Sequence, residues 1–344
     1  MRVLYVYRWA TMGGVERVLL NRAKTFQRHG LAVVQAVHFL SDGGGLAGFS
    51  QAIQAYGVAD WLGIQREFMP QSYDCLIAID TPEVLSLDRR EKPLWFECHT
   101  AYVENRQYLQ RLSEEVQGIL TPSQHFAQQL MQELPEPWRD KVFPLRNGLP
   151  PYQAPDLGKR AIPRWNKQLI AYVGRIDALK NTDELIRAIA YLRKQQGDQY
   201  LLFFVGPVDQ PAALWKKVEK QGLLDRFVYL PPVPFERVPW VWAMIRENRG
   251  LFASASQGES FGLSAAEAIL ASLPVVLSDA HRDLVGGESS VLYPLGDHRG
   301  AAEKIAWTFA HYEAAADRAR TLQPLFSEAG FLQDWQQFQA RIRD

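Results

Sequence analysis

Cysteine is scarce in this sequence. The 344 residues include only Cys75 and Cys98, and no two cysteines stand in the CxxC spacing. One bridge is arithmetically possible, but a disulfide framework is excluded. A chain with so little cysteine fits a reducing compartment, and we therefore expect a cytoplasmic protein.

An excess of charge and long apolar runs are also absent. The 38 basic and 38 acidic residues cancel, so no global field draws the chain to nucleic acid or to an anionic membrane. No apolar run approaches the ~20 residues of a membrane span. The start, MRVLYVYRWATMGG, lacks the apolar core and cleavage site of a signal peptide. We expect neither a nucleic-acid partner nor a membrane-spanning segment.

Metal-binding motifs are missing as well. The sequence has no DxD, no HExxH and no paired cysteine–histidine spacing, so no metal is predicted. The MGG of residues 12–14 is neither GxGxxG nor a P-loop, which disfavours dinucleotide or Walker-type binding at that loop.

Strand-like and helical segments alternate along the N-terminal part. Val3–Tyr7 is an apolar run, and apolar residues then recur at helical spacing up to Gly30, at Val15, Val18, Leu19, Ala23 and Phe26. Later short apolar runs are LAVVQAVHFL, YDCLIAID, LWFECHT and GILTPS. This alternation predicts βα units around a parallel sheet.

The pattern breaks in a proline-rich segment and restarts at LIAYVGR. We predict an N-terminal domain over residues 1–148, a linker over 149–166 and a C-terminal domain over 167–326. The predicted fold class is α/β, with two tandem doubly wound Rossmann-like domains facing across a cleft. Ligands are expected beyond the carboxyl ends of the strands.

The segment YVGRIDALKNTDEL places two cations between a strand and a helix. The predicted strand ends at Gly174, and Arg175 and Lys180 precede a helix that Asn181 or Thr182 would cap. A guanidinium and an ammonium near a helix start suit a diphosphate. The alternative interpretation is two solvated surface cations.

The segment SASQGESFGLSAAEAILASLPVV carries two carboxylates, Glu259 and Glu267, around a predicted helix start. Ser264 and Glu267 have capping-box spacing, and an exposed loop glutamate is the alternative for Glu259. A helix start favours phosphate, whereas ionised carboxylates accept hydrogen bonds from hydroxyl groups. Phosphate and polyol recognition together predict a nucleotide-sugar site.

Two further candidates lie in the N-terminal domain. Gly13 and Gly14 stand between the first strand and the first helix, where the backbone can turn tightly and contact an anion. His99 follows the strand LWFEC and is expected at the same cleft. A structural histidine is the alternative for His99.

Together these segments resemble retaining glycosyltransferases of the GT-B fold, specifically glycosyltransferase family four. GRIDALKNTDELIRA and SASQGESFGLSAAEAILASLPVVLSD carry the resemblance, supported by MGGVERVLLNRA, TPSQHFAQQL, RNGLP and VLYPLGDHRGAAEKI. It covers nearly the whole chain. It implies metal-independent transfer of a hexose, with retention, from a UDP or GDP sugar to a hydroxyl acceptor. No cofactor is implied.

The resemblance also implies roles for individual residues. Arg175 and Lys180 would grip the donor diphosphate and stabilise the leaving group. Glu259 would bind sugar hydroxyls and Glu267 the ribose, while His99 would stand near the transferred sugar. The other implied donor-binding positions are Gly13, Gly14, Gly174, Ser260, Phe261, Gly262 and Leu263.

Some segments depart from the family pattern or go beyond it. SDAHRDLVGG lacks the common glycine-glycine-x-proline-glutamate run, and His281 and Arg282 stand there instead. The contacts on that side of the site are left open. The resemblance implies that the last helix, residues 327–344, crosses back to the N-terminal domain. Its apolar face is Phe331, Leu332, Trp335, Phe338 and Ile342.

The acceptor is expected to be a glycan, a glycolipid or a small hydroxyl compound of bacterial polysaccharide or cell-envelope biosynthesis. AYVENRQYLQRL predicts an amphipathic helix with Arg106 and Arg111 outward. Such a face is either solvated or a peripheral contact with the inner side of a membrane. The alternative functions are a nucleotide-sugar epimerase, a phosphorylase and a non-catalytic nucleotide-sugar-binding scaffold.

Overall fold

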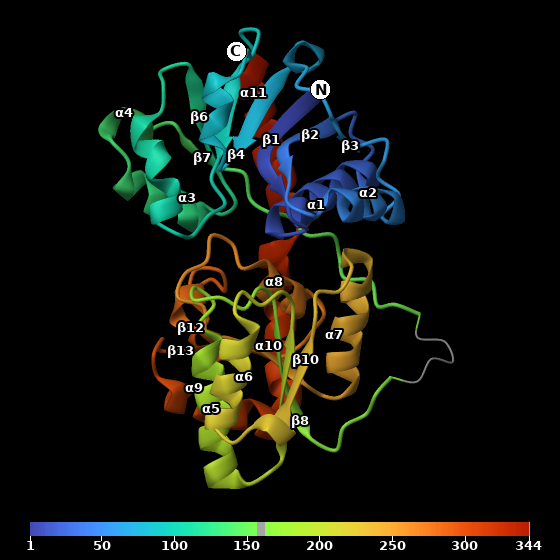
Figure 1. Ribbon diagram of the computed structural model, residues 1–344, viewed down its shortest axis with the longest axis vertical. Coiled ribbons are helices and arrows are strands. Elements are labelled where there is room, and N and C mark those ends of the chain that lie inside the picture. The colour runs from blue at the N-terminus through green and yellow to red at the C-terminus, as the bar shows by residue number, and fades with distance from the viewer. Residues whose placement is uncertain (157–161, 344) are drawn as a thin grey trace. The chain divides into compact units, whose positions relative to one another are not determined.

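The computed structural model of the protein describes residues 1–156 and 162–343. The chain divides into two compact units. Unit 1 comprises Met1–Pro150 with Ser327–Asp344, and unit 2 comprises Pro151–Phe326. Each unit has its own sheet and its own helices (Figure 1). Residues 157–161 of the predicted linker lie outside the described residues.

Unit 1 is built on a seven-stranded parallel sheet with the order β3-β2-β1-β4-β5-β6-β7. In chain order β1 to β7, the strands are Arg2–Ala10, Val34–Asp42, Leu62–Ile64, Cys75–Ile79, Leu94–Glu97, Val116–Thr121 and Val142–Pro144. The central strands β4 and β5 are buried along their whole length, which explains their continuous apolar runs. The predicted parallel sheet is therefore confirmed.

The helices of unit 1 cover this sheet. They are α1 Gly14–Arg28, α2 Leu46–Ala55, α3 Gln124–Glu133, the short α4 Glu136–Arg139 and the C-terminal α11 Glu328–Arg343. Ser123 caps α3 by accepting a hydrogen bond from the Phe126 N–H. The predicted first helix corresponds to α1, and Gly30 follows it with a φ of +62°.

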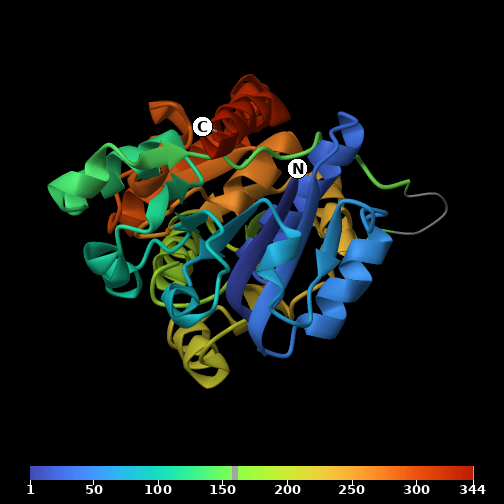
Figure 2. The same ribbon diagram turned by 90° about the horizontal axis from the view of Figure 1, so that it is seen from above.

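Helix α11, red in Figures 1 and 2, packs within unit 1 although it is the last element of the chain. Its Trp335 is fully buried and lies 4.8 Å, ring to ring, from Phe26 of α1. Phe338 contacts Trp95 of β5 at 5.2 Å. The Asp334 carboxylate pairs with Arg146 at 2.6 Å. These contacts bury the apolar face that the sequence of this helix predicts.

Unit 2 contains a six-stranded parallel sheet with the order β10-β9-β8-β11-β12-β13. In chain order β8 to β13, the strands are Gln168–Val173, Tyr200–Val205, Phe227–Leu230, Leu251–Ser254, Val275–Ser278 and Leu292–Tyr293. The helices are α5 Thr182–Gln196, α6 Pro211–Lys220, α7 Val238–Glu247, α8 Leu263–Leu270, α9 His298–Ala310 and α10 Tyr312–Leu322. The strand order changes direction between β8 and β11, so this unit is doubly wound as predicted.

One predicted surface feature of unit 1 is wrong in part. The segment forms a 3-10 helix, Glu104–Arg111, and Arg111 is exposed as predicted. Arg106 does not point outward: its side chain is 3% exposed and pairs with Glu133 at 2.6 Å. Its guanidinium also donates to the Thr100 and Ala101 carbonyls. A buried, fully engaged arginine cannot serve a basic membrane-facing surface.

Candidate functional site

The carboxyl ends of β8 and β9 approach each other closely through two glycines. Gly174 follows β8 with a φ of +149°, and Gly206 follows β9 with a φ of +138°. A Cβ on Gly206 would lie 2.1 Å from the Gly174 carbonyl oxygen. Only glycine can occupy position 206 at this distance. The close approach of the two strand ends fixes the start of the loop that carries Arg175 and Lys180.

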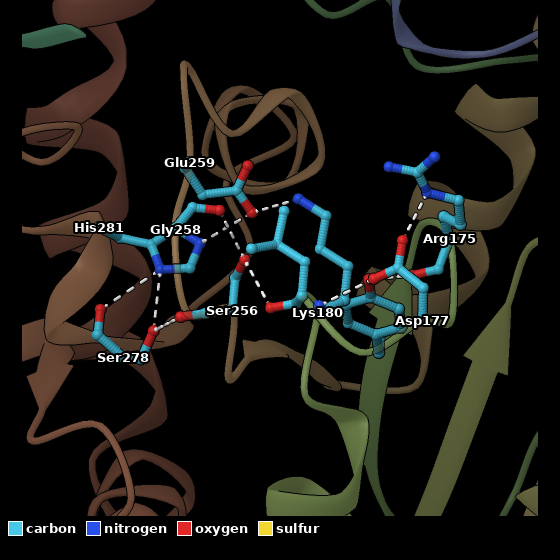
Figure 3. Close-up of polar contacts among 10 residues, drawn as sticks. Arg175, Asp177, Lys180, Ser256, Gly258, Glu259, Ser278 and His281 are labelled. Carbon is cyan, nitrogen blue, oxygen red and sulfur yellow. Dashed lines mark hydrogen bonds and ion pairs between the residues drawn. The ribbon is translucent and has the colours of Figure 1, made fainter. Parts of the chain in front are cut away.

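Lys180 and Glu259 form an ion pair in unit 2. The ammonium of Lys180, in the loop after β8, lies 2.6 Å from Glu259 Oε1, in the loop after β11 (Figure 3). Their side chains are 20% and 13% exposed. Since β8 and β11 are neighbours in the sheet, residues 79 positions apart meet at its carboxyl edge. This is the switch point at which doubly wound sheets bind ligands.

His281 reaches the same carboxylate from a third loop. It ends the 3-10 turn Asp279–His281 after β12, and its Nε2 lies 3.7 Å from Glu259 Oε1. Its Nδ1 lies 3.2 Å from Ser278 Oγ, which in turn donates to the Ser256 carbonyl at 2.6 Å. In Figure 3 the ammonium of Lys180 and the ring of His281 approach Glu259 from opposite sides.

Burial and charge act in opposite directions on Glu259. Burial alone would raise its pKa, but Lys180, and then His281, more than offset that effect and lower the pKa below the ordinary value. The pKa of His281 is also lowered, chiefly because burial disfavours the charged ring. At neutral pH the Glu259 carboxylate is therefore ionised and the His281 imidazole is neutral.

Arg175 lies beside this cluster but pairs elsewhere. Its Nε lies 2.6 Å from Asp177 Oδ2, and Asp177 Oδ1 accepts the Lys180 backbone N–H at 2.9 Å. The side chain is 53% exposed, and in Figure 3 its guanidinium lies above Asp177. The buried Asp177 thus ties together the two cations that the sequence singled out.

The predicted capping box at α8 is wrong. The N-cap is Gly262 with a φ of +79°, and Ser264 lies inside the helix. The Glu267 carboxylate accepts a hydrogen bond from Trp242 Nε1 at 3.3 Å. Phe261 is buried against Phe326, with ring centroids 6.1 Å apart. Gly262 and Leu263 form the start of α8.

His99 lies in unit 1 and is held by a buried ion pair. Its Nε2 lies 2.8 Å from Glu97 Oε1, and its backbone N–H donates to Asp80 at 3.0 Å. The Glu97 carboxylate also pairs with both terminal nitrogens of Arg22, and Arg22 and Glu97 are buried. Burial alone would raise the pKa of Glu97, but Arg22 and His99 lower it to about 2. An ionised Glu97 therefore fixes the His99 ring.

The glycine loop before α1 already contains an anion of its own. The backbone N–H groups of Thr11, Met12 and Gly13 donate to the carboxylate of Glu16, at 2.7, 3.1 and 2.9 Å. Glu16 is fully buried. The Gly13 N–H is thus engaged within the loop, and the predicted anion contact there would have to use other groups.

Two glycine-rich runs have the spacing of known motifs, and the first also lies between a strand, β2, and a helix, α2. Gly43, Gly45 and Gly48 fit GxGxxG, but the Gly44 N–H donates to Asp42 and the Gly45 N–H to the Ala10 carbonyl. Residues 258–262, GESFG, fit GxSxG, but the segment lies in a loop and not in a sharp strand-to-helix turn. Neither run predicts a phosphate cradle or a nucleophile.

Neither a metal centre nor a membrane span is found in the part of the chain that the structure describes. No group of three or more His, Cys, Asp or Glu side chains there could hold a metal ion. No helix in residues 1–156 and 162–343 combines the length and the apolar character that crossing a membrane requires.

Most of unit 2 matches a known protein family. Residues 159–319 match the family described as glycosyl transferases group 1. The D-inositol 3-phosphate glycosyltransferase of Nocardia farcinica is 36% identical over 130 residues, which is 36% of this chain and 27% of the relative. The 2-deoxystreptamine glucosyltransferase of Streptomyces kanamyceticus is 28% identical over 191 residues, 55% of this chain and 47% of the relative. The matched parts thus span about a quarter to a half of these relatives.

Solved structures resemble the whole chain. Anabaena HepE in complex with UDP and glucose has a TM-score of 0.75 at 18% identity, covering 100% of this chain and 99% of that one. The pneumococcal O-GlcNAc transferase GtfA in complex with UDP and GlcNAc has a TM-score of 0.74 at 11% identity, with 99% of each chain covered. At such identities the likeness establishes the fold, which is that of GT-B glycosyltransferases. The predicted α/β fold class with two doubly wound Rossmann-like domains is confirmed.

Several functional candidates escaped the sequence analysis. His281 was noted only as a departure from the family pattern, and Asp177, Arg22 and Glu97 were not singled out. A signal for the last pair exists, because a glutamate inside the buried strand LWFEC requires a partner. The identity of that partner, 75 residues away in α1, becomes clear only in the fold.

Proposed function

We propose that the protein is a retaining, metal-independent glycosyltransferase that moves a hexose from a nucleoside diphosphate sugar to a hydroxyl acceptor. The observation that carries the proposal is the Lys180–Glu259–His281 cluster at the carboxyl edge of the unit 2 sheet. This cluster lies within the segment that matches glycosyl transferases group 1. It offers a cation for phosphate oxygens beside acceptors for sugar hydroxyls.

In this proposal the protein's own cations take the place that a metal ion holds in other transferases. The leaving nucleoside diphosphate gains negative charge as the sugar bond breaks, and Lys180 and Arg175 would stabilise that charge. Asp177 positions both, because it binds the Arg175 side chain and the Lys180 backbone. Glu259 would hold the sugar ring by accepting hydrogen bonds from its hydroxyls.

The remaining roles follow the family resemblance. Glu267 would accept hydrogen bonds from the ribose, with the buried Trp242 fixing its carboxylate. The backbone of residues 260–263 would line the sugar and phosphate. His99, fixed by Glu97, would contact the transferred sugar or the acceptor from unit 1. The names of two relatives include the polyhydroxylated compounds inositol phosphate and 2-deoxystreptamine, which supports a hydroxyl acceptor.

Product analysis tests this proposal directly. The protein would be incubated with UDP- and GDP-hexoses and a panel of glycan, glycolipid and cyclitol acceptors, with and without EDTA. We expect one donor to yield a glycoside whose anomeric configuration, read by proton NMR, equals that of the donor, with EDTA having no effect. An inverted product would contradict retention, and an isomerised donor without acceptor would indicate an epimerase. Tight donor binding without turnover on any acceptor would indicate a scaffold.

A further inference from the structure

The protonation of His281 can be read from its hydrogen bonds. Ser278 Oγ donates its only proton to the Ser256 carbonyl at 2.6 Å, so toward His281 it can only accept. His281 Nδ1 lies 3.2 Å from this Oγ and 3.3 Å from the Ser278 carbonyl oxygen, which is also an acceptor. Nδ1 therefore carries the ring proton, and in the neutral ring Nε2 has a bare lone pair.

That lone pair faces a carboxylate. In the described part of the chain, the polar partner of Nε2 is Glu259 Oε1, and the 3.7 Å between them is too long for a hydrogen bond. Burial lowers the pKa of His281, which keeps the ring neutral at pH 7. Glu259 Oε1 accepts a hydrogen bond from the Lys180 ammonium at 2.6 Å, but the ammonium does not supply a donor to His281 Nε2, whose neighbour is this acceptor oxygen.

The charges around this pair restrict what can bind there. Lys180, 2.6 Å from the same carboxylate, repels a cation, and Glu259 itself repels a phosphate. A neutral group with O–H donors satisfies both acceptors without meeting either repulsion. A sugar ring, with hydroxyls on adjacent carbons, presents such donors at the spacing of two neighbouring acceptors.

We propose that His281 Nε2 and Glu259 together accept hydrogen bonds from hydroxyls of the donor's sugar ring, so that His281 determines which sugar is bound. This assignment rests on the proposed function, because it requires a nucleotide sugar in unit 2. It gives a role to the residue that stands where the family pattern has glycine, proline and glutamate. A buried acceptor left unpaired disfavours a sugar that lacks the matching hydroxyl.

Two variants and a neighbouring control separate this role from a packing role. His281→Leu removes both ring nitrogens, and His281→Gln restores a side-chain acceptor if the leucine variant folds poorly. Arg282→Ala changes the next residue, which is exposed. Dissociation constants would be measured for UDP and UDP-glucose, and for GDP and GDP-mannose, by calorimetry. The first probe of each pair lacks the hexose, whose hydroxyls are the proposed hydrogen-bond donors to His281.

We expect His281→Leu to weaken binding of the sugar nucleotide by about tenfold or more, while binding of the matching diphosphate stays within about twofold. His281→Gln should recover part of the loss, and Arg282→Ala should behave as wild type. Deoxy-sugar nucleotides should identify the hydroxyl that donates to His281. The deoxy compound that lacks this hydroxyl should bind the wild type and His281→Leu with equal affinity. Equal weakening of diphosphate and sugar nucleotide would overturn the assignment, as would no weakening of either.

A measurement on the free protein distinguishes failure of this assignment from failure of the proposed function. Nitrogen-15 NMR of the imidazole groups, with His281→Gln identifying the resonance, reports which nitrogen is protonated. We expect the proton on Nδ1. A proton on Nε2 would overturn the acceptor pair whether or not the protein transfers sugar. Failure of all nucleotides to bind the wild type would instead contradict the proposed function and, with it, the ligand assigned here.

Discussion

Glu259 illustrates how burial and charge together prepare a side chain for ligand binding. Its carboxylate is 13% exposed, and it remains ionised because Lys180 lies 2.6 Å away. A carboxylate in such surroundings is an acceptor that has lost most of its water, so a hydroxyl donor finds little competition. The same environment makes Lys180 important for more than its charge, since removing it would leave a buried anion.

Lys180→Ala should lower turnover by at least ~100-fold while the fold persists, because one group that stabilises the leaving diphosphate is lost. Turnover would be followed by release of nucleoside diphosphate, and folding by circular dichroism. Lys217→Ala is the matched control: Lys217 is a half-exposed lysine on α6, paired with Asp183, and its loss should leave turnover unchanged. Near-normal turnover in Lys180→Ala would contradict the assigned role.

The Arg22–Glu97 pair makes a prediction about stability and pH. Glu97 has a folded-state pKa of about 2, below the ordinary ~4.3 of an unfolded glutamate. The unfolded chain therefore binds more protons between these values, and the stabilisation is present above about pH 4.3 and lost as the pH falls toward 2. The lowered pKa of Glu97 contributes on the order of 3 kcal/mol to the free energy of unfolding at neutral pH.

Urea unfolding at pH 7 and at pH 3 measures this effect. The wild type should lose more unfolding free energy on acidification than the double variant Arg22→Met/Glu97→Gln, which removes both buried charges together. Removing only one partner would leave an unpaired buried charge and confound the comparison. Equal losses in the two proteins would show that Glu97 does not titrate as its surroundings imply.

At the scale of elements, the contact between the ends of β8 and β9 places the loop that carries Lys180. Gly206→Ala should destabilise unit 2 by at least about 2 kcal/mol, because the new Cβ would meet the Gly174 carbonyl oxygen at 2.1 Å. Gly63→Ala, in strand β3, should stay within about 0.5 kcal/mol, since a Cβ there meets nothing within 4 Å. Thermal unfolding of both variants checks this. A stable Gly206→Ala would mean that the strand ends can move apart.

The alternation of apolar runs predicted β1, β2, β4, β5, β6 and β8, because βα units have a strong local pattern. It missed β3 and β7, which have three residues each and whose pairing comes from neighbouring strands. It misjudged the start of α8, where Gly262 occupies the N-cap and leaves Ser264 inside the helix. Local spacing alone does not decide which residue takes the cap.

The candidate site was predictable in part for the same reason. Lys180 and Glu259 each follow a strand of unit 2, so their loops were expected at one edge of the sheet. Their ion pair, and the approach of His281 to the same carboxylate, depend on strand order, which the sequence pattern does not specify. The burial of Arg106 likewise depends on Glu133 in α3. The feature that the sequence could not predict was which distant residue pairs with each charged side chain.

At the scale of the whole molecule, the two units carry different parts of the predicted site. Unit 2 holds the Lys180–Glu259–His281 cluster, and unit 1 holds His99 with its buried Arg22–Glu97 support. Both sheets are parallel and doubly wound, and both place their candidate residues after strands. With no net charge on the chain, recognition of an anionic donor depends on these local groups.

The central claim is that unit 2 binds a nucleoside diphosphate without a metal ion. Thermal unfolding would be recorded with UDP, GDP, ADP, CDP and TDP, each with and without EDTA. We expect one nucleotide, at 100 times its dissociation constant, to add ~2.7 kcal/mol to the unfolding free energy and raise the transition by several degrees, with EDTA changing nothing. If no nucleotide shifts the transition, the Arg175–Lys180–Glu267 region is not a nucleotide site and the proposed function is contradicted.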